Sequence, residues 1–173
     1  MVEFSLKHRT TGENQVDLSR QKVVLTRQGY EDIQRELEEI QTIKRPALVR
    51  RIREARQLGD LSENFDYHDA KRQQGMIDGR IKELKSILGQ AMVVDKSESD
   101  GHATVGSTVV IKDLDEGFEE TYSIVGPAES SPGDGKISHE STMGGALMGH
   151  KAGEMVSVET PAGVFRYEIL SVT

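Results

Sequence analysis

Two stretches of apolar residues at heptad spacing constrain what this chain can fold into. In the second stretch, positions seven residues apart form two series, which are Ala70, Ile77, Leu84 and Ala91, and Gln74, Ile81 and Leu88. In the first stretch, spacings of three and four join Tyr30, Ile33, Leu37 and Ile40. This spacing is the a/d pattern of coiled-coil helices. The sequence therefore predicts two long helices that pack against each other along one apolar seam.

Single residues predict where the first helix begins, bends and ends. Thr26 follows a short apolar run and is placed to cap a helix that begins at Arg27. Pro46 removes a backbone donor, so we expect a kink or a local register shift there. Beyond it the apolar pattern continues at Leu48, Ile52 and Ala55. Gly59 ends the helix, as glycine after a helix end often does.

The short connection between the two helices predicts a hairpin. The second helix begins at about Ser62, so only a few residues separate the helices and they must run antiparallel. Helices of roughly 30 residues at about 1.5 Å each make a rod on the order of 45 Å long. We call residues 59–64 the tip of the hairpin. The heptad pattern alone favours a plain interpretation, in which the hairpin is a dimerisation or adaptor arm.

The composition changes near residue 95 and divides the chain into two domains. Helix formers dominate before this point, and Val, Thr and Gly become common after it. Alternating apolar positions then predict strands, at Val105, Ser107, Val109, Ile111, Tyr122, Ile124, Val156, Val158, Phe165, Tyr167 and Ile169. We predict an α+β protein with an antiparallel coiled-coil domain at 23–96 and a small antiparallel β domain at 101–173. Residues 1–22 show no sustained period, and we expect a mobile extension.

Several segments of the second domain are interpreted as connections. Residues 112–117 do not match the ligand positions of a calcium loop and predict a hairpin turn. Residues 142–149 predict a short helix or loop against the sheet and lack a phosphate-binding glycine pattern. Residues 160–163 place Pro early and Gly late, as turns do. No complete active site is visible in the sequence, which favours a factor that acts on another molecule.

Charge and cysteine content narrow the class of protein. Residues 100–173 carry 4 Lys and Arg against 12 Asp and Glu, so any contact with nucleic acid is expected in the first domain. The chain has no Cys, which excludes disulfides, thiolate zinc sites and cysteine nucleophiles. No apolar run approaches the roughly 20 residues that span a bilayer. We therefore expect a cytoplasmic protein with no membrane partner.

The tip carries two carboxylates three residues apart. Asp60 and Glu63 offer the oxygen ligands that Mg²⁺ prefers, but two carboxylates make only a partial site. The plain interpretation is that Asp60 or Ser62 caps the second helix and that Glu63 stabilises its positive N-terminus. Spacing alone favours capping, and the two roles are compatible for different residues.

Beside the tip lie a basic stretch and a histidine. Arg50, Arg53 and Arg56 step by three along the first helix and form a stripe that could follow a phosphate backbone. A solvated face with ion pairs to Asp66, Asp69 or Glu54 fits equally well. Residues 67–69 are Tyr-His-Asp, but no second His lies at helical spacing, so packing or hydrogen bonding at the hairpin end is favoured over a metal site.

The sequence resembles the Gre transcript-cleavage factors of bacteria, and among them the GreA branch. The likeness runs from about Val24 to Val172. It is carried by residues 45–46, 55–56, 59–64, 67–68, 73–75, 79–81, 144–153 and 160–163, of which the tip sequence Gly59, Asp60, Leu61, Ser62, Glu63 and Asn64 is the most specific.

The resemblance implies a mechanism. The hairpin would enter the secondary channel of bacterial RNA polymerase while an FKBP-like domain at 101–173 docks at its outer rim. Asp60 and Glu63 would help to hold a second Mg²⁺, shared with the polymerase and not bound stably by this chain alone, for cleavage of the 3′ end of backtracked nascent RNA. Gly59, Leu61, Ser62 and Asn64 would shape the tip, and Arg50, Arg53 and Arg56 would lie near the RNA. The chain would be a monomeric accessory factor and not itself an enzyme.

Some features depart from the family, and other functions stay open. The extension before Val23 has no counterpart in a minimal Gre chain, and too few aromatic residues are present for a prolyl isomerase pocket. The alternatives are an inhibitory paralogue that enters the same channel, a coiled-coil adaptor, and an isomerase-like chaperone acting through residues 104–173. The acidic tip argues against the inhibitory paralogue.

Overall fold

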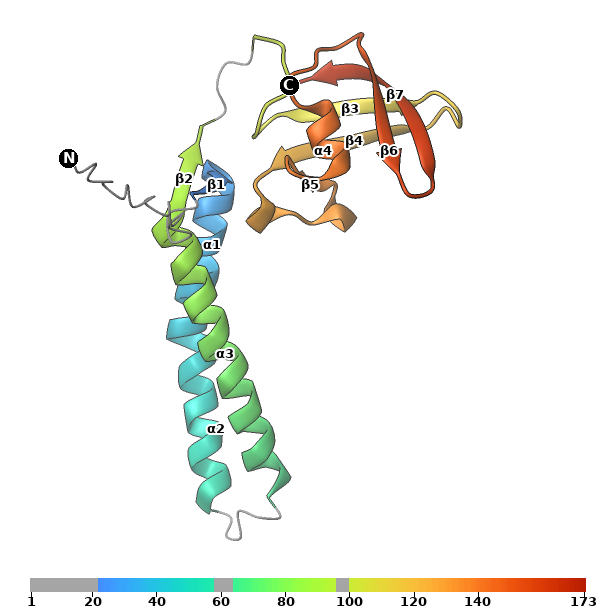
Figure 1. Ribbon diagram of the computed structural model, residues 1–173. Helices are drawn as coiled ribbons and strands as arrows, with labels where there is room; N and C mark the ends of the chain where they lie inside the picture. Colours follow the sequence, from blue (N-terminus) through green and yellow to red (C-terminus); the bar gives the residue numbers. More distant parts are fainter. Residues whose placement is uncertain (1–21, 58–63, 96–99) are drawn as a thin grey trace, which may run out of the picture.

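A computed structural model describes residues 22–57, 64–95 and 100–173 of the 173-residue chain (Figure 1). The described residues form a long helical hairpin and a β domain. The β domain lies beside the base of the hairpin, far from the other end, where α2 (Arg45–Gln57) ends and α3 (Phe65–Gln90) begins. The predicted α+β class and the helical hairpin are therefore confirmed. The predicted extension falls almost entirely outside the described residues, since these begin at Lys22.

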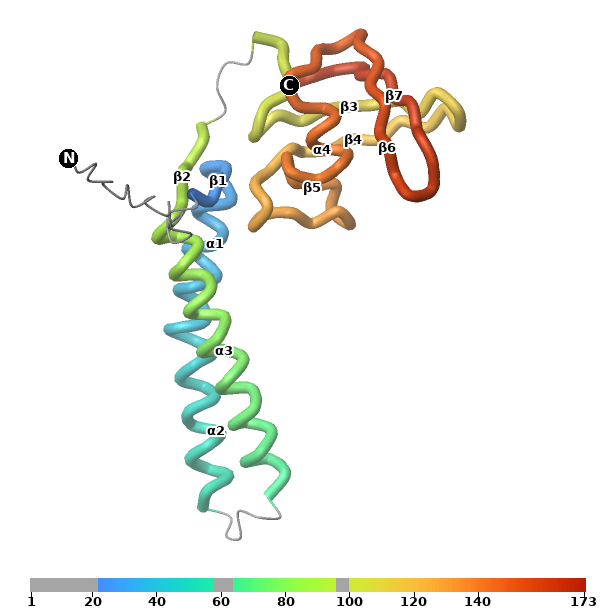
Figure 2. The backbone as a smooth tube through the Cα atoms, in the orientation of Figure 1, coloured from blue at the N-terminus to red at the C-terminus, as the bar shows by residue number. Residues whose placement is uncertain are grey.

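The first arm of the hairpin is a continuous series of elements, and its helical part begins at Arg27, as the sequence predicts. It contains β1 (Val23–Thr26), α1 (Arg27–Glu39), the π-helical turn η2 (Ile40–Lys44) and α2 (Arg45–Gln57). The Thr26 hydroxyl accepts a hydrogen bond from the Gly29 amide at 2.9 Å, which confirms its N-cap role. Figure 2 traces this arm running antiparallel to the second one.

The π-helical turn explains how the apolar seam continues past Pro46. The Arg45 amide bonds back to the Ile40 carbonyl, five residues earlier, so η2 holds one more residue per turn than an α-helix. From Ile33 onward, the buried residues of this arm are accordingly seven, eight and seven residues apart, at Ile33, Ile40, Leu48 and Ala55. The predicted register shift near Pro46 is confirmed, and it keeps all four side chains on one face.

The second arm is the single helix α3 (Phe65–Gln90), 26 residues long. Ala70 and Leu84 are fully buried in it, as the heptad pattern predicts. The helix begins three residues later than predicted, because its N-cap is Asn64. Capping by Asp60 or Ser62 is therefore wrong, since an N-cap must directly precede the first helical residue.

A small sheet closes the base of the hairpin. Strand β2 (Ala91–Val94) continues from α3 and pairs in parallel with β1, with Val23 opposite Ala91. Leu25 of β1 is fully buried and packs with Ile33, Ile40 and Leu84 in the core of this domain. The sequence did not predict this sheet, because its strands are four residues long and far apart in the chain.

The second domain is a five-stranded sheet with the order β5-β4-β3-β7-β6. Its strands are β3 (Thr108–Asp113), β4 (Glu119–Val125), β5 (Lys136–Ser138), β6 (Met155–Thr160) and β7 (Gly163–Val172). The pairing is antiparallel as predicted, except that β4 and β5 are parallel. The predicted turns at 112–117 and 160–163 join β3 to β4 and β6 to β7.

Helix α4 (Thr142–Leu147) covers one face of this sheet (Figure 1). The core between them includes Val109, Ile111, Ile124, Leu147 and Ile169, each fully buried. Two short 3-10 turns, η3 (Pro127–Glu129) and η4 (Pro132–Asp134), connect β4 to β5. In the part of the chain that the structure describes, no helix is long and apolar enough to cross a membrane.

Candidate functional site

The end of the hairpin is the first candidate site, and the structure describes its two flanks. Helix α2 ends at Gln57, and α3 begins at Phe65 after its cap, Asn64. Five of the six predicted tip residues lie outside the described residues, namely Gly59, Asp60, Leu61, Ser62 and Glu63. Their roles stay predictions. What the structure shows is how the two helix ends are joined next to them.

Asn64 ties the two helix ends together with one side chain. Its Oδ1 accepts a hydrogen bond from the Tyr67 amide at 3.0 Å and so caps α3. Its Nδ2 donates to the Ala55 carbonyl in the last turn of α2 at 2.7 Å. An amide can accept on one atom and donate on the other, whereas a carboxylate only accepts. Asn64 therefore fixes the spacing of the two helices at the base of the tip.

Ion pairs and aromatic contacts brace the same end. A terminal nitrogen of Arg51 lies 3.1 Å from an Asp66 oxygen and 3.3 Å from an Asp69 oxygen, which links α2 to α3. The Arg56 guanidinium lies 5.8 Å from the centre of the Tyr67 ring, within reach of a cation–π contact. Packing and hydrogen bonding at the hairpin end are thus confirmed for Tyr67 and Asp69, whereas His68 is exposed and its ring lies edge-on to Tyr67 at 5.7 Å.

An exposed aromatic side chain stands at this end. Phe65 is the first residue of α3 and keeps 87% of its surface accessible to solvent. No pattern in the sequence indicates this exposure, because a lone Phe in a helical stretch is ordinarily part of a core. Its position next to the tip gives the end of the hairpin an apolar, aromatic surface as well as charge.

The predicted basic stripe lies on the surface of the hairpin. Arg50, Arg53 and Arg56 are all exposed on α2. The ion pairs with Asp66 and Asp69 that the plain interpretation expected are made by Arg51 instead. Within residues 22–57, 64–95 and 100–173, no ion pair involves the three stripe arginines. Arg56 lies over the Tyr67 ring, and all three guanidinium groups remain exposed to solvent.

Farther along the rod, a charge pair holds the two arms in register. Two nitrogens of Arg80 on α3 donate to the two carboxylate oxygens of Glu36 on α1, both at 2.8 Å. The hydrogen bond from Arg80 lowers the pKa of the Glu36 carboxyl, and the same pair raises the pKa of Arg80. Arg45 reaches Asp78 on the other arm at 3.1 Å in a similar way.

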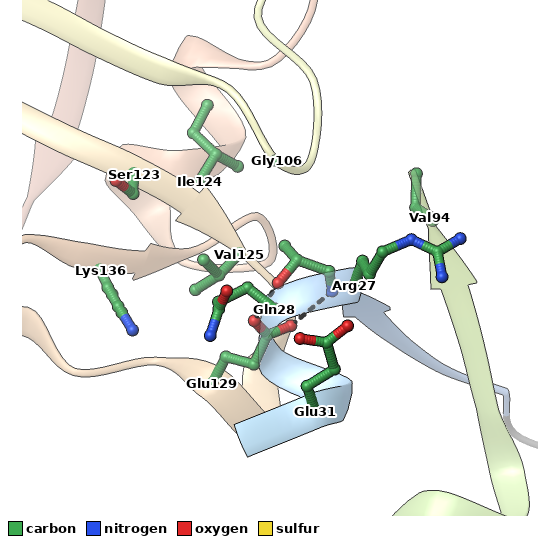
Figure 3. A pocket seen from close by; sticks show the side chains of 11 residues that line it. Arg27, Gln28, Glu31, Val94, Gly106, Ser123, Ile124, Val125, Glu129 and Lys136 are labelled. Carbon is green, nitrogen blue, oxygen red and sulfur yellow. Dashed lines mark hydrogen bonds between the residues drawn. The ribbon is translucent and has the colours of Figure 1, made fainter. Parts of the chain in front are cut away.

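A second feature with polar chemistry lies where the two domains meet (Figure 3). A hollow of about 420 Å³ is lined by the start of α1 on one side and by β4 and η3 on the other. Across it, Glu129 of η3 accepts hydrogen bonds from the amide of Thr26 at 2.7 Å and from its hydroxyl at 2.5 Å. No local pattern in the sequence indicates this contact, because it joins positions 103 residues apart.

The described residues contain no group of three or more His, Cys, Asp or Glu side chains that could hold a metal ion. In the sequence, the carboxylates that suit a metal ion are those of the tip residues Asp60 and Glu63, which lie three positions apart. Carboxylate oxygens suit Mg²⁺, and two of them leave most of its six coordination positions to water or to a partner.

Comparison with known proteins identifies the two domains separately. Residues 23–93 match the family described as "Transcription elongation factor, N-terminal", and residues 98–173 match "Transcription elongation factor, GreA/GreB, C-term". Transcription elongation factor GreA of Chloroflexus aurantiacus is 46% identical over 149 residues, which cover 86% of this chain and 95% of that protein. Its namesake in Thermotoga maritima is 44% identical over 87% of this chain and 97% of its own length.

Solved structures with a related sequence are also found. The GreA factor homolog 1 protein of Thermus thermophilus is 29% identical, with a TM-score of 0.41 over 88% of this chain and 99% of its own.

Proposed function

This chain belongs to the GreA/GreB family of transcription elongation factors, and we propose that it stimulates RNA cleavage by bacterial RNA polymerase. In this proposal the hairpin enters the secondary channel of the polymerase, and the β domain stays at the outer rim. The 3′ end of backtracked nascent RNA is then cut, and elongation restarts from the new end. The chain is an accessory factor, and the catalytic centre belongs to the polymerase.

The observation that carries this proposal is the shape and bracing of the hairpin. Its arms are held side by side along their length by one apolar seam and by cross-pairs such as Glu36–Arg80. Its far end is closed by the Asn64 hydrogen bond to Ala55. Two packed helices, each about 10–12 Å across, form a thin and stiff rod on the order of 45 Å long. Such a rod is suited to carry a few side chains deep into a narrow channel.

The tip chemistry supplies the second part of the proposal. Asp60 and Glu63 would hold Mg²⁺ together with ligands from the polymerase. This chain would not bind the ion stably by itself, because two carboxylates make only a partial site. When bound, Mg²⁺ neutralises developing phosphoryl charge and lowers the pKa of coordinated water. The role of Asp60 and Glu63 is to place their carboxylates where this ion is needed. The spacing fixed by Asn64 at the base of the tip supports that role.

The basic stripe supports contact with the RNA. Arg50, Arg53 and Arg56 are exposed on the same helix that leads to the tip. Guanidinium groups bind phosphates through charge and paired hydrogen bonds, independently of base sequence. A backtracked 3′ segment that leaves the catalytic centre along the rod would pass the tip first and would then lie beside these groups.

A cleavage assay on a stalled polymerase tests the proposal. Backtracked elongation complexes are incubated with Mg²⁺ and with the wild-type chain, Asp60→Ala or Glu63→Ala, and short 3′ RNA fragments are followed over time. Glu38→Ala, which changes an exposed acid on α1, is the matched control. We expect wild type and Glu38→Ala to accelerate fragment release, and the two tip variants to lose at least about tenfold of that acceleration, as expected for loss of a metal ligand.

The other outcomes separate the alternatives. Equal stimulation by all four proteins would show that the tip carboxylates take no part. Suppression of cleavage by the wild-type chain would identify an inhibitory factor. No effect on cleavage together with binding to another protein would identify an adaptor.

A further inference from the structure

The contact between the two domains is built by specific residues on both sides. Glu129 lies on η3 of the β domain, and Thr26 lies at the turn from β1 into α1 (Figure 3). Both oxygens of the Glu129 carboxylate are used, one by the Thr26 amide and the other by its hydroxyl. A carboxylate that receives two donors from one residue is held in position and in orientation.

Thr26 performs three tasks at this point. Its hydroxyl accepts from the Gly29 amide and so caps α1, and it donates to Glu129 at the same time. Its amide donates to the other oxygen of Glu129. The carboxylate therefore also lies at the positive end of α1, where negative charge is stabilised. The start of the hairpin is thus completed by a side chain from the other domain.

Two glycines let the domains approach this closely. A Cβ at Gly126 would lie 1.8 Å from the backbone oxygen of Val24 in β1, so no other residue fits without moving one backbone away from the other. A Cβ at Gly29 would lie 1.9 Å from the Glu129 carboxylate. Gly126 and Gly29 are both buried, one on each side of the contact.

We propose that Glu129, Thr26 and Gly126 form a lock that fixes the orientation of the β domain on the hairpin and thereby positions the tip. The consequence for cleavage rests on the proposed function, in which the β domain docks at the outer rim of the polymerase while the hairpin enters the secondary channel. For a rod of roughly 45 Å, a rotation of about 5° at the base moves the far end by about 4 Å. Misplacement of reacting groups by about 1 Å can cost about 100-fold in rate. The lock residues are positioning residues and touch no RNA.

The orientation is measured first, without the polymerase. The chain has no cysteine, so Glu38→Cys on α1 and Ser157→Cys on β6, both exposed, carry spin labels for distance measurement in the full chain. We expect a single narrow distance distribution for the parent protein. Glu129→Ala and Gly126→Val are expected to broaden or shift it, and Glu129→Gln, which keeps one acceptor oxygen, is expected to do so less. Thr26→Ser keeps both the amide and the hydroxyl donor, so we expect it to show the same narrow distance distribution as the parent protein.

The cleavage assay then tests the positioning role on the same substitutions. At saturating factor, we expect Glu129→Ala and Gly126→Val to lower the maximal cleavage rate about 10- to 100-fold, with a smaller change in the half-saturating concentration. Glu159→Ala, an exposed acid on β6, is the matched control and is expected to match wild type. Thermal unfolding by circular dichroism confirms that each variant is folded.

Each result decides a separate claim. An unchanged distance distribution in folded Glu129→Ala and Gly126→Val overturns the lock. A changed distribution with a wild-type maximal cleavage rate overturns the positioning role. If the wild-type chain does not stimulate cleavage, the proposed function fails while the distance measurement still decides the lock. Asp60→Ala should lose cleavage and keep the parent distribution, which separates a tip defect from a lock defect.

Discussion

At the scale of single residues, Asn64 shows how one side chain can define the geometry of a loop. It caps α3 through the Tyr67 amide and holds the last turn of α2 through the Ala55 carbonyl. Ser, Thr and Asp also cap helices, and the sequence offered Asp60 and Ser62 for that task. A carboxylate such as that of Asp60 only accepts, whereas the Asn64 amide also donates to the opposite helix. Asn64 therefore both starts α3 and joins it to α2.

Substitution of Asn64 should separate its two bonds. Asn64→Asp keeps the cap but places a carboxylate against the Ala55 carbonyl, and Asn64→Ala loses both bonds. We expect each to lower the free energy of unfolding by about 1–2 kcal/mol, measured by urea denaturation. We also expect each to reduce stimulated cleavage, while Gln57→Ala leaves both quantities near wild type. If Asn64→Asp matches wild type in both, the bond to Ala55 has no role.

The pair between Glu36 and Arg80 predicts a dependence of stability on pH. The pKa of Glu36 is lowered in the folded state, so its contribution is present above the unfolded pKa of about 4.3 and is lost as pH falls through the folded pKa. Because both side chains are partly exposed, we expect under about 1 kcal/mol at pH 6. The free energies of unfolding of wild type and Glu36→Gln should therefore converge toward pH 3. A gap that stays constant from pH 6 to pH 3 would exclude this linkage.

At the scale of elements, local patterns predicted much of the fold, and long-range pairs were missed. Thr26, the heptad seams and the turn at 160–163 act through neighbours in sequence, so the helices and most strands could be predicted. The β1–β2 pair and the Glu129 contact join segments that are far apart in the chain and leave no local pattern. Strand β5 was missed because three residues are too few to show an alternating pattern. In the candidate site, the structure shows that the three arginines of the stripe are exposed. The metal role of Asp60 and Glu63 stays a prediction.

The π-helical turn predicts which single-residue deletions the hairpin tolerates. Deletion of Ile43, an exposed residue of η2, would convert the eight-residue spacing between Ile40 and Leu48 to seven and keep the seam. The proline ring would then clash inside an α-helix, at a cost of about 3 kcal/mol, so the deletion is combined with Pro46→Ala. We expect this variant to keep its helical circular dichroism and to unfold near the wild-type temperature.

Deletion of Gln34 is the matched control, because it removes an exposed residue within α1, where no extra residue is present. It would rotate the start of the arm by about 100° and expose two buried side chains, costing about 3–6 kcal/mol. Equal thermal stability of the two deletion variants would contradict the claim that η2 contains the one extra residue between Ile40 and Leu48.

At the scale of the whole molecule, the two domains differ in charge. The β domain is acidic, and the exposed arginine stripe lies on the arm that leads away from it. An acidic domain is repelled by RNA phosphates, which favours contact through the rod alone. The lock at Glu129 joins these two surfaces into one orientation.

Charge reversal of the stripe tests this division. The triple variant Arg50→Glu, Arg53→Glu and Arg56→Glu should cleave long backtracked RNA more slowly and show a weaker dependence on salt, since each lost phosphate contact lowers that dependence. Its free energy of unfolding should change little, because the side chains are exposed. The control is Lys82→Glu with Lys85→Glu, which reverses exposed charge on α3 near the base. Equal losses in both variants would assign the effect to net charge and not to the stripe.

The shared metal site is tested by the Mg²⁺ dependence of stimulated cleavage. Backtracked complexes are saturated with wild type, Asp60→Asn or Glu63→Gln, and the cleavage rate is measured over a range of Mg²⁺ concentrations. We predict that wild type lowers the half-saturating Mg²⁺ concentration relative to polymerase alone, and that each variant raises it again by at least about tenfold. The same half-saturating concentration and the same maximal rate for all three proteins would contradict a metal site completed by Asp60 and Glu63.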